Sequence, residues 1–208
     1  MREIRIYFEG DSRLTEGFQK FLEQQIAAAR ERRCRVQLVN GGARSTAIED
    51  FKLALQTHPA SWNVLLIDSE GADDGTLLAR SGLPPAQRSS VFWMVQLMES
   101  WFLADIPALR DFYDQGFREG RLAAKRDLEN VPKKDVMTWL ENATRRTRKG
   151  KYDKAAHAPR LLALIDPELV QKACPNCRRI SEAFCERLQE SRLRHAATKL
   201  EERRRRRG

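Results

Sequence analysis

The stretch Asn63-Val64-Leu65-Leu66-Ile67-Asp68-Ser69-Glu70 decides the fold that this sequence predicts. Residues 63–67 form a short apolar run between polar flanks, which is typical of a β-strand buried on both of its faces. The run leads directly into two acids, Asp68 and Glu70. A strand of this kind needs covering helices on both sides, so the stretch favours a parallel sheet between layers of helices.

The same alternation of strand and helix extends outward from this stretch. A helix is expected after Ser12, which should cap it, and another is expected after the turn at residues 40–45. In both segments apolar residues recur at helical spacing. An irregular connection is expected at 76–89, and a further helix at 97–104. The central stretch is one strand, and three more are expected at residues 3–9, 35–39 and 90–95. The order predicts an α/β fold with a small, mostly parallel, four-stranded sheet flanked by helices.

No further strand is expected after Pro107, and the rest of the chain predicts an all-helical C-terminal annex. The expected helices span residues 136–147, 156–165, 167–173 and 180–200. The chain is therefore divided into a sheet domain, a basic helical annex and an arginine-rich tail, at residues 1–105, 106–200 and 201–208.

Charge is divided unevenly between the two halves of the 208-residue chain. Residues 1–104 hold 12 basic and 13 acidic side chains, a net charge of −1, whereas residues 105–208 hold 26 and 16, a net charge of +10. The basic half predicts a polyanionic partner such as nucleic acid. Four cysteines are too few for a disulfide scaffold, and no apolar run is long enough for a signal peptide or a membrane span. A cytoplasmic protein without a membrane partner is expected.

Acidic side chains follow three of the expected strands. Glu9 ends the first strand, Asp68 ends the third with Glu70 just beyond, and Glu99 comes just after the fourth. The carboxyl ends of parallel strands meet at one edge of a sheet, so these side chains should gather there. Clustered carboxylates repel one another unless a cation neutralises them, and hard oxygen ligands favour Mg²⁺ or Mn²⁺.

Acids at strand ends also have two ordinary roles that need no metal ion. Acids at strand ends are often solvated loop residues or helix caps, and that is the expected role of Asp11, Asp73 and Asp74. Taken together, however, Glu9 before Gly10 and the Asp68-x-Glu70 pair favour a metal site.

The residues around these acids resemble a known family. Phe8-Glu9-Gly10-Asp11-Ser12 and Leu66-Ile67-Asp68-Ser69-Glu70 are similar to the TOPRIM pattern, in which one strand ends in Glu-Gly and a later strand ends in Asp-x-Asp. The segments 95–104 and 150–154 resemble small defence-associated TOPRIM-like proteins related to RloB and to the OLD-type nucleases, many of them encoded beside an ATPase. The sequence departs from the pattern at Glu70, which stands in place of the second aspartate.

The resemblance implies a metal-dependent nuclease that hydrolyses phosphodiester bonds in DNA or RNA, with residues 1–105 as its catalytic domain. It implies that Glu9 is a general acid/base or metal-bridging residue and that Asp68 and Glu70 are metal ligands. Glu99 would be a further ligand or an orienting carboxylate. Lys154, in a Tyr-x-Lys element, would approach the acids as a phosphate or transition-state contact. The implied partner is a separately encoded ATPase in antiviral defence.

A basic segment precedes Lys154. Residues 145–157 contain six cations and one aromatic ring. Cations release counterions when they bind phosphates, and an exposed ring can stack on a base. The expected nucleic-acid contacts are Arg145, Arg146, Arg148, Lys149, Lys151 and Tyr152, with His157 as a weaker candidate for a phosphate contact. The alternative is a solvated basic helix end.

Two other motifs carry less weight. Cys174-Pro175-Asn176-Cys177 has the spacing of half a zinc site, but Cys185 and His195, which would complete it, do not share a helix face. The turn at residues 40–45 could bind a phosphate at a helix N-terminus. It lacks the Gly-Lys-Ser/Thr of a P-loop, so a tight turn is expected and an ATPase within this chain is not.

The leading hypothesis is thus a Mg²⁺-dependent endonuclease, the effector subunit of an ATPase-coupled defence system. One alternative is a non-catalytic subunit that binds nucleic acid and an ATPase through a degenerate TOPRIM site. A third hypothesis, nucleotidyl or phosphoryl transfer, uses the same metal chemistry on another substrate. The sequence leaves a homodimer and the number of metal ions open.

Overall fold

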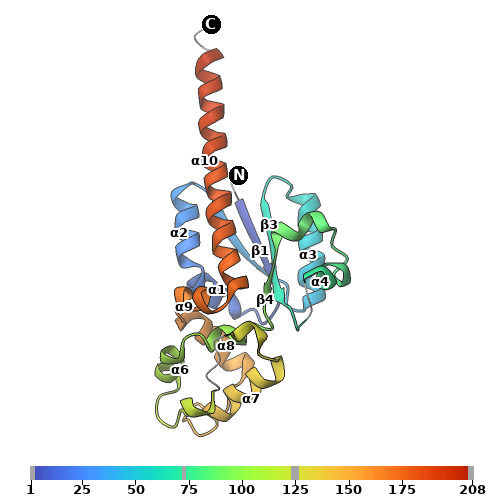
Figure 1. Cartoon of the computed structure of the whole chain (residues 1–208). Coiled ribbons are helices and arrows are strands. Elements are labelled where there is room, and N and C mark those ends of the chain that lie inside the picture. Colours follow the sequence, from blue (N-terminus) through green and yellow to red (C-terminus); the bar gives the residue numbers. More distant parts are fainter. Residues whose placement is uncertain (1–2, 72–73, 123–126, 206–208) are drawn as a thin grey trace.

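The computed structural model describes residues 3–71, 74–122 and 127–205, with side chains up to Glu190 apart from that of Asp74 (Figure 1). Its centre is an all-parallel sheet with the strand order β2-β1-β3-β4. The prediction of a small parallel four-stranded sheet flanked by helices is confirmed. The strands are β1 (Glu3–Phe8), β2 (Arg35–Asn40), β3 (Trp62–Asp68) and β4 (Val91–Met94).

The apolar run of the sequence forms the interior strand β3, and all seven of its residues are buried. Alternate side chains of a strand point to opposite faces. Accordingly, Val64 and Leu66 join one apolar cluster, and Leu65 and Ile67 join another on the far face. Burial on both faces explains why this strand shows no polar alternation in the sequence.

Helices cover both faces of the sheet (Figure 1). The face with Leu65 packs against α3 (Arg44–Thr57) and α4 (Asp74–Arg80). On the face with Leu66 lie α1 (Leu14–Phe21), α2 (Glu23–Glu31) and the first part of the long helix α10 (Pro175–Arg205).

The remaining helices lie beyond the carboxyl ends of the strands (Figure 1). In the described residues after Met94 no strand is found, which confirms an all-helical C-terminal part. The apolar core crosses residue 105, since Phe8 and Phe18 belong to the same cluster as Leu161 and Phe184. The helices are α5 (Glu99–Phe102), α6 (Ile106–Tyr113), α7 (Lys133–Thr144), α8 (Lys154–Leu164) and α9 (Pro167–Ala173), with short 3₁₀ turns at Pro85–Ser90, Glu119–Arg121 and Leu128–Asn130.

Several expected boundaries differ from the structure. The connection at 76–89 contains α4 and a 3₁₀ turn, because Leu77 and Leu78 pack into the core. Helix α10 begins at Pro175, five residues before the expected start, since proline is well tolerated in the first helical turn. The cap of α1 is Arg13 rather than Ser12, and no side chain caps it. Asp73 and residues 206–208, the end of the arginine-rich tail, lie outside the described residues.

Helix α1 packs closely against α8, and Gly17 makes this approach feasible. A Cβ atom at Gly17 would lie 2.7 Å from the Pro159 carbonyl oxygen and 3.0 Å from the Leu162 Cβ. Only a residue without a side chain fits at this crossing. The contact sets the N-terminal turn of α1 beside the N-terminal turn of α8.

We expect Gly17→Ala to destabilise the fold by about 1–3 kcal/mol, because overpacking of a close helix contact outweighs the gain in helix propensity. Gly120→Ala is the control, since a Cβ there meets nothing within 4 Å; it should change the free energy of unfolding by less than about 0.5 kcal/mol. Urea denaturation of both variants measures this difference. A Gly17→Ala protein as stable as the wild type would show that the helices are less tightly packed.

Among the described residues, no helix is both long and apolar enough to cross a lipid bilayer.

Candidate active site

Two strand ends bring Glu9 and Asp68 together. Asp68 is the last residue of β3, and Glu9 directly follows the neighbouring strand β1. The Glu9 Oε1 atom accepts a hydrogen bond from the Asp68 backbone amide at 3.1 Å. Both residues line a pocket of about 150 Å³ at the carboxyl edge of the sheet. Its other lining residues are Gly10, Leu14, Gly42, Arg44, Met94, Met98 and Lys154.

Arg44 closes one side of this pocket. It opens α3, and its Nε donates to Glu9 Oε2 at 2.9 Å, while its Nη2 donates to the Asp68 backbone carbonyl. Burial lowers the pKa of the guanidinium, but the Glu9 carboxylate more than offsets this, so the pKa of Arg44 is raised overall. Sequence reasoning missed this residue. The available signal was its position directly after the turn that ends β2, at the same edge of the sheet.

Lys154 closes the other side. It is the first residue of α8, whose N-cap Asp153 accepts a hydrogen bond from the Ala156 amide at 2.8 Å. The Lys154 Nζ lies 3.3 Å from Glu99 Oε1 and 3.9 Å from Asp68 Oδ2. Burial lowers the pKa of Lys154, but the two carboxylates raise it overall. The expected approach of Lys154 to the acids is present in the structure.

Glu99 lies behind Lys154 and is fully buried at the start of α5. Its Oε1 accepts a hydrogen bond from the Tyr152 hydroxyl at 3.0 Å. The Tyr152 side chain is itself 3% exposed, and burial together with Glu99 raises the pKa of its hydroxyl. The prediction that Tyr152 stacks on a base is therefore wrong, because its ring is packed inside the protein and its hydroxyl serves Glu99.

The pKa of the Asp68 carboxyl is raised to about 7. Burial is the main cause, and the charges of Glu9 and Glu99 add to it, against the opposing effects of Lys154 and of the Met98 amide. That amide donates to Asp68 Oδ1 at 2.8 Å. At neutral pH the Asp68 carboxyl therefore binds a proton more readily than an exposed aspartate would.

Glu70 lies outside this pocket. It sits in the loop after β3 with a φ of 54°, and its side chain is half exposed. Its Oε1 accepts from Lys133 Nζ at 2.7 Å, and its Oε2 lies 3.4 Å from Arg44 Nη1. The hydrogen bond from Lys133 is the main reason why the pKa of Glu70 is lowered. The longer side chain and the left-handed backbone direct this carboxylate toward α7.

The four acids are therefore not assembled into one set of metal ligands. Within the described part of the chain, no group of three or more His, Cys, Asp and Glu side chains is placed to hold a metal ion. Glu9 and Asp68 alone share the pocket, and they supply hard oxygen donors. Mg²⁺ is commonly bound through one or two carboxylates while it keeps several water ligands. This pair fits such an ion.

A family model described as Domain of unknown function (DUF4276) matches residues 11–188. The chain belongs to this family. No curated protein and no protein of known structure matches the chain. Within the DUF4276 match lie Asp68, Glu99 and Lys154, whereas Glu9 lies two residues before its start.

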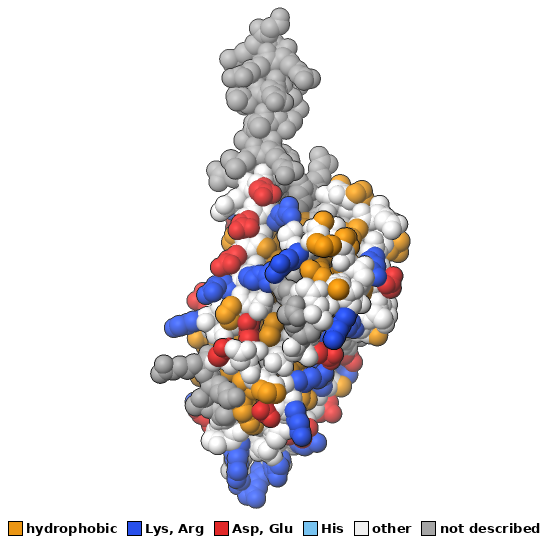
Figure 2. All heavy atoms as spheres, turned by 45° about the vertical axis from the view of Figure 1, so that its right-hand side comes forward, with side chains coloured by type: hydrophobic (Ala, Val, Ile, Leu, Met, Phe, Trp, Pro, Cys, Tyr) orange, Lys and Arg blue, Asp and Glu red, His pale blue; other side chains and the backbone are white. Residues whose placement is uncertain are grey.

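The basic segment of the DUF4276 domain forms an exposed turn between α7 and α8. Lys151 pairs with Glu141 Oε2 at 3.3 Å, and the Lys149 Nζ lies 4.9 Å from the centre of the Phe112 ring. Figure 2 shows lysine and arginine side chains gathered at the lower end of the molecule, away from the free end of α10. The exposed cations of the turn are Arg145, Arg146, Arg148, Lys149 and Lys151.

His157 does not face this surface. It is 7% exposed, and its Nδ1 accepts from the Asp153 amide at 3.1 Å and lies 3.0 Å from the Tyr113 hydroxyl. Burial lowers the pKa of the imidazole. The expected phosphate contact by His157 is wrong, because the ring belongs to the packing between α6 and α8.

The remaining candidates take no part in the pocket. Cys174 and Cys177 are buried at the junction of α9 and α10, and burial raises the pKa of both thiols. Cys185 is exposed, and the side chain of His195 lies outside the described residues. Asp11 forms an ion pair with Arg13 at 2.8 Å, as befits a loop acid.

Asp68→Asn should change how stability depends on pH. An unfolded aspartate has a pKa of about 3.9, so between about pH 4 and pH 7 the folded state binds the extra proton, and the wild type loses stability as pH rises. Asparagine can still accept from Met98. The variant should exceed the wild type by at least about 1 kcal/mol above pH 7, and the difference should shrink toward pH 4.

Urea denaturation from pH 4 to pH 8 measures this, with Asp111→Asn as an exposed control that should follow the wild type. Parallel curves for the wild type and Asp68→Asn would contradict the raised pKa.

Tyr152→Phe should destabilise the protein by about 1–3 kcal/mol, because it removes a hydrogen bond from a fully buried carboxylate. The same change in a Glu99→Gln background should cost less, since the acceptor is then uncharged. A double-mutant cycle measured by denaturation checks this coupling. Additive losses would mean that the Tyr152 hydroxyl does not act through Glu99.

Proposed function

We propose that this protein is a metal-dependent nuclease that hydrolyses phosphodiester bonds in DNA or RNA. One observation carries the proposal: two carboxylates, Glu9 and Asp68, share a pocket with the cations Lys154 and Arg44. Oxygen donors for a divalent ion next to cations for phosphate oxygens suit metal-assisted cleavage of a phosphodiester. The resemblance of the Glu9-Gly10 and Asp68-Ser69-Glu70 elements to the TOPRIM pattern supports the same activity.

Glu9 and Asp68 would hold Mg²⁺ or Mn²⁺. When bound, such an ion lowers the pKa of a water molecule and neutralises charge that develops on the phosphate. The raised pKa of Asp68 supports this role, because a nearby cation would favour the ionised carboxylate.

Lys154 is the proposed contact for a non-bridging phosphate oxygen. Its ammonium lies at the pocket and is half exposed, so it can donate to a substrate without leaving Glu99. Glu99 is a positioning residue in this proposal rather than a ligand. Its carboxylate is fully buried and already accepts hydrogen bonds from Tyr152 and Lys154.

Arg44 would change partners when substrate binds. Its guanidinium now pairs with Glu9, the carboxylate proposed to bind the metal ion. A phosphate offers the planar guanidinium a pair of acceptors, whereas Glu9 accepts from it through one oxygen. Transfer of Arg44 from Glu9 to the phosphate would free the carboxylate for the ion.

A separately encoded ATPase and a role in antiviral defence belong to the same proposal. They are supported by the resemblance of residues 95–104 and 150–154 to the defence-associated proteins.

The ion pairs of the site favour a second candidate function. Arg44 pairs with Glu9, Lys133 with Glu70 and Lys154 with Glu99, so most of the acids have cationic partners without any metal ion. A site neutralised in this way would suit a non-catalytic subunit that binds nucleic acid and an ATPase.

We expect the purified protein to cleave DNA or transfer RNA in Mg²⁺ or Mn²⁺. Glu9→Gln and Asp68→Asn should each reduce the rate at least roughly a hundredfold, since each removes a donor from the reacting centre. Glu70→Gln should change the rate far less because it lies outside the pocket, and Glu49→Gln, at an exposed position of α3, is the control.

Cleavage by Asp68→Asn at the wild-type rate would refute the assigned mechanism. A thermal melt with and without Mg²⁺ distinguishes the second candidate. The nuclease proposal requires that Mg²⁺ stabilises the wild type and not the Glu9→Gln, Asp68→Asn double variant. Equal stabilisation of both, without cleavage, would favour the non-catalytic subunit.

A further inference from the structure

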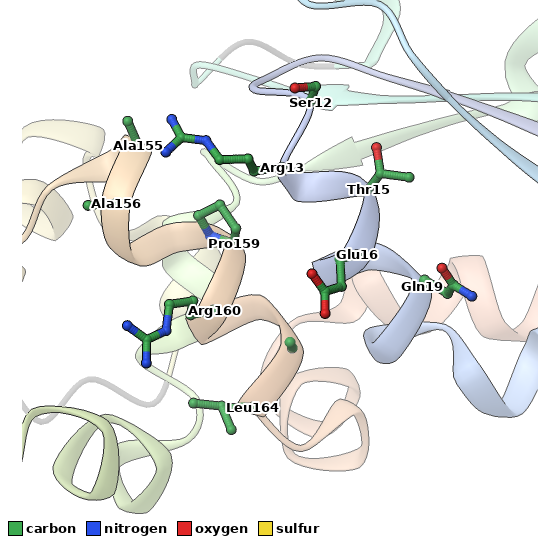
Figure 3. Close-up of a pocket in the computed structure, with 11 residues that line it drawn as sticks. Ser12, Arg13, Thr15, Glu16, Gln19, Ala155, Ala156, Pro159, Arg160 and Leu164 are labelled. Carbon is green, nitrogen blue, oxygen red and sulfur yellow. The ribbon is translucent and has the colours of Figure 1, made fainter.

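A groove runs along the contact between α1 and α8 (Figure 3). It encloses about 820 Å³, and residues of α1 and its preceding turn face residues of α8 across it. The turn contributes Arg13, which reaches toward Ala155 at the start of α8, whereas Arg160 points away from α1 (Figure 3). No role has been assigned so far to this groove.

The groove begins beside the carboxylate pocket. Leu14 and Lys154 line the pocket, and their chain neighbours Arg13 and Ala155 line the groove. At its other end, Arg160 and Leu164 also line a further hollow of about 510 Å³ that contains Lys149 and Phe112. The three hollows together follow α8 from its first turn to its last.

Four cations mark this path: Lys154, Arg13, Arg160 and Lys149. Arg13 is held by Asp11 at 2.8 Å. In the part of the chain that the structure describes, Arg160 and Lys149 have no carboxylate within ion-pair distance, and both lie over the Phe112 ring, at 5.2 Å and 4.9 Å from its centre. Cations held on an aromatic ring remain available to an anionic ligand.

Acids line the three hollows in the same number as cations once Arg44 is counted, so the unpaired state of Arg160 and Lys149 among the described residues, and not a net charge, distinguishes this path. The Asp105 carboxylate accepts from the Ala108 and Asp166 backbone amides, at 3.0 Å and 2.8 Å, and thereby joins α6 to the start of α9. Glu16 and Asp111 are the other acids that line the groove and the outer hollow.

We infer that this path binds the sugar-phosphate backbone of a nucleic acid and leads it into the carboxylate pocket. The inference rests on the proposed nuclease function, because it specifies how the substrate of that pocket is held. Helix α8 has 11 residues, which is about 16 Å, so a strand that follows it passes several phosphates along the path. The path offers four cations to them.

The chemistry of the path favours the backbone over the bases. Tyr152 is buried, and the Phe112 ring, 5% exposed, lies beneath two cations, so neither ring offers a face for stacking. The carboxylate pocket, at about 150 Å³, is smaller than typical ligand sites of about 300–1,000 Å³, which suits a phosphodiester group. Contacts of this kind position a strand without reading its sequence.

Fluorescence anisotropy with two labelled 20-nucleotide DNA strands of unrelated sequence tests the inference. EDTA is present, so that binding is measured without cleavage. Arg160→Glu and Lys149→Glu should each raise the Kd at least about fivefold and reduce the slope of log K against log salt by about 0.7. Arg80→Glu makes the same charge change on α4, on the other face of the sheet, and should raise the Kd less than about twofold.

The inference is overturned if the wild type binds neither strand, if it binds only one of them, or if Arg80→Glu weakens binding as much as Arg160→Glu. Cleavage assays of the same variants separate the two proposals. Groove-dependent binding without Glu9-dependent cleavage supports the path and refutes the nuclease. Glu9-dependent cleavage with normal binding by Arg160→Glu refutes the path and leaves the nuclease intact.

Discussion

The ammonium of Lys154 lies beside two carboxylates that the fold has largely removed from water. Glu99 is fully buried and Asp68 is 5% exposed, so their charges need partners inside the protein. Lys154 supplies one from the start of α8, and Tyr152 holds Glu99 from the preceding turn. This requirement ties the C-terminal helices to the carboxyl edge of the sheet. The close crossing of α1 and α8 at Gly17 then fixes the distance between these helices and the sheet edge.

The parts of the fold that depend on local periodicity could be predicted from the sequence. The apolar run before Asp68 indicated a strand buried on both faces, and the acids at strand ends indicated which edge would carry the site. Glu9 and Asp68 follow from that rule alone, because parallel strands end at the same edge. Helix boundaries were less accurate, since Leu77 and Leu78 join the core through contacts that no local pattern reveals.

The positions that sequence reasoning misjudged are those decided by tertiary packing. Tyr152 stands among cations in the sequence, which favoured an exposed role, yet the chain turns its ring inward to reach Glu99. Glu70 stands two residues from Asp68, but its left-handed backbone sends its side chain toward Lys133. Arg44 enters the site because the loops after β1 and β2 are joined, through a hydrogen bond from the Gly10 amide to the Gly42 carbonyl. Such contacts between distant segments leave no trace in local spacing.

The joining of α1 to α8 also governs the order in which the protein can acquire its site during synthesis. Glu9, Asp68 and Glu99 leave the ribosome well before Lys154, and domains generally fold as units once their chain has emerged. Until α8 emerges, the sheet edge has acids without their lysine, and Gly17 has no helix to pack against. The fully buried Glu99 therefore favours late closure of the core around it. The pocket is thus completed when α8 packs, whereas the core over the sheet also needs α10, which emerges later and packs Phe184 against Trp62.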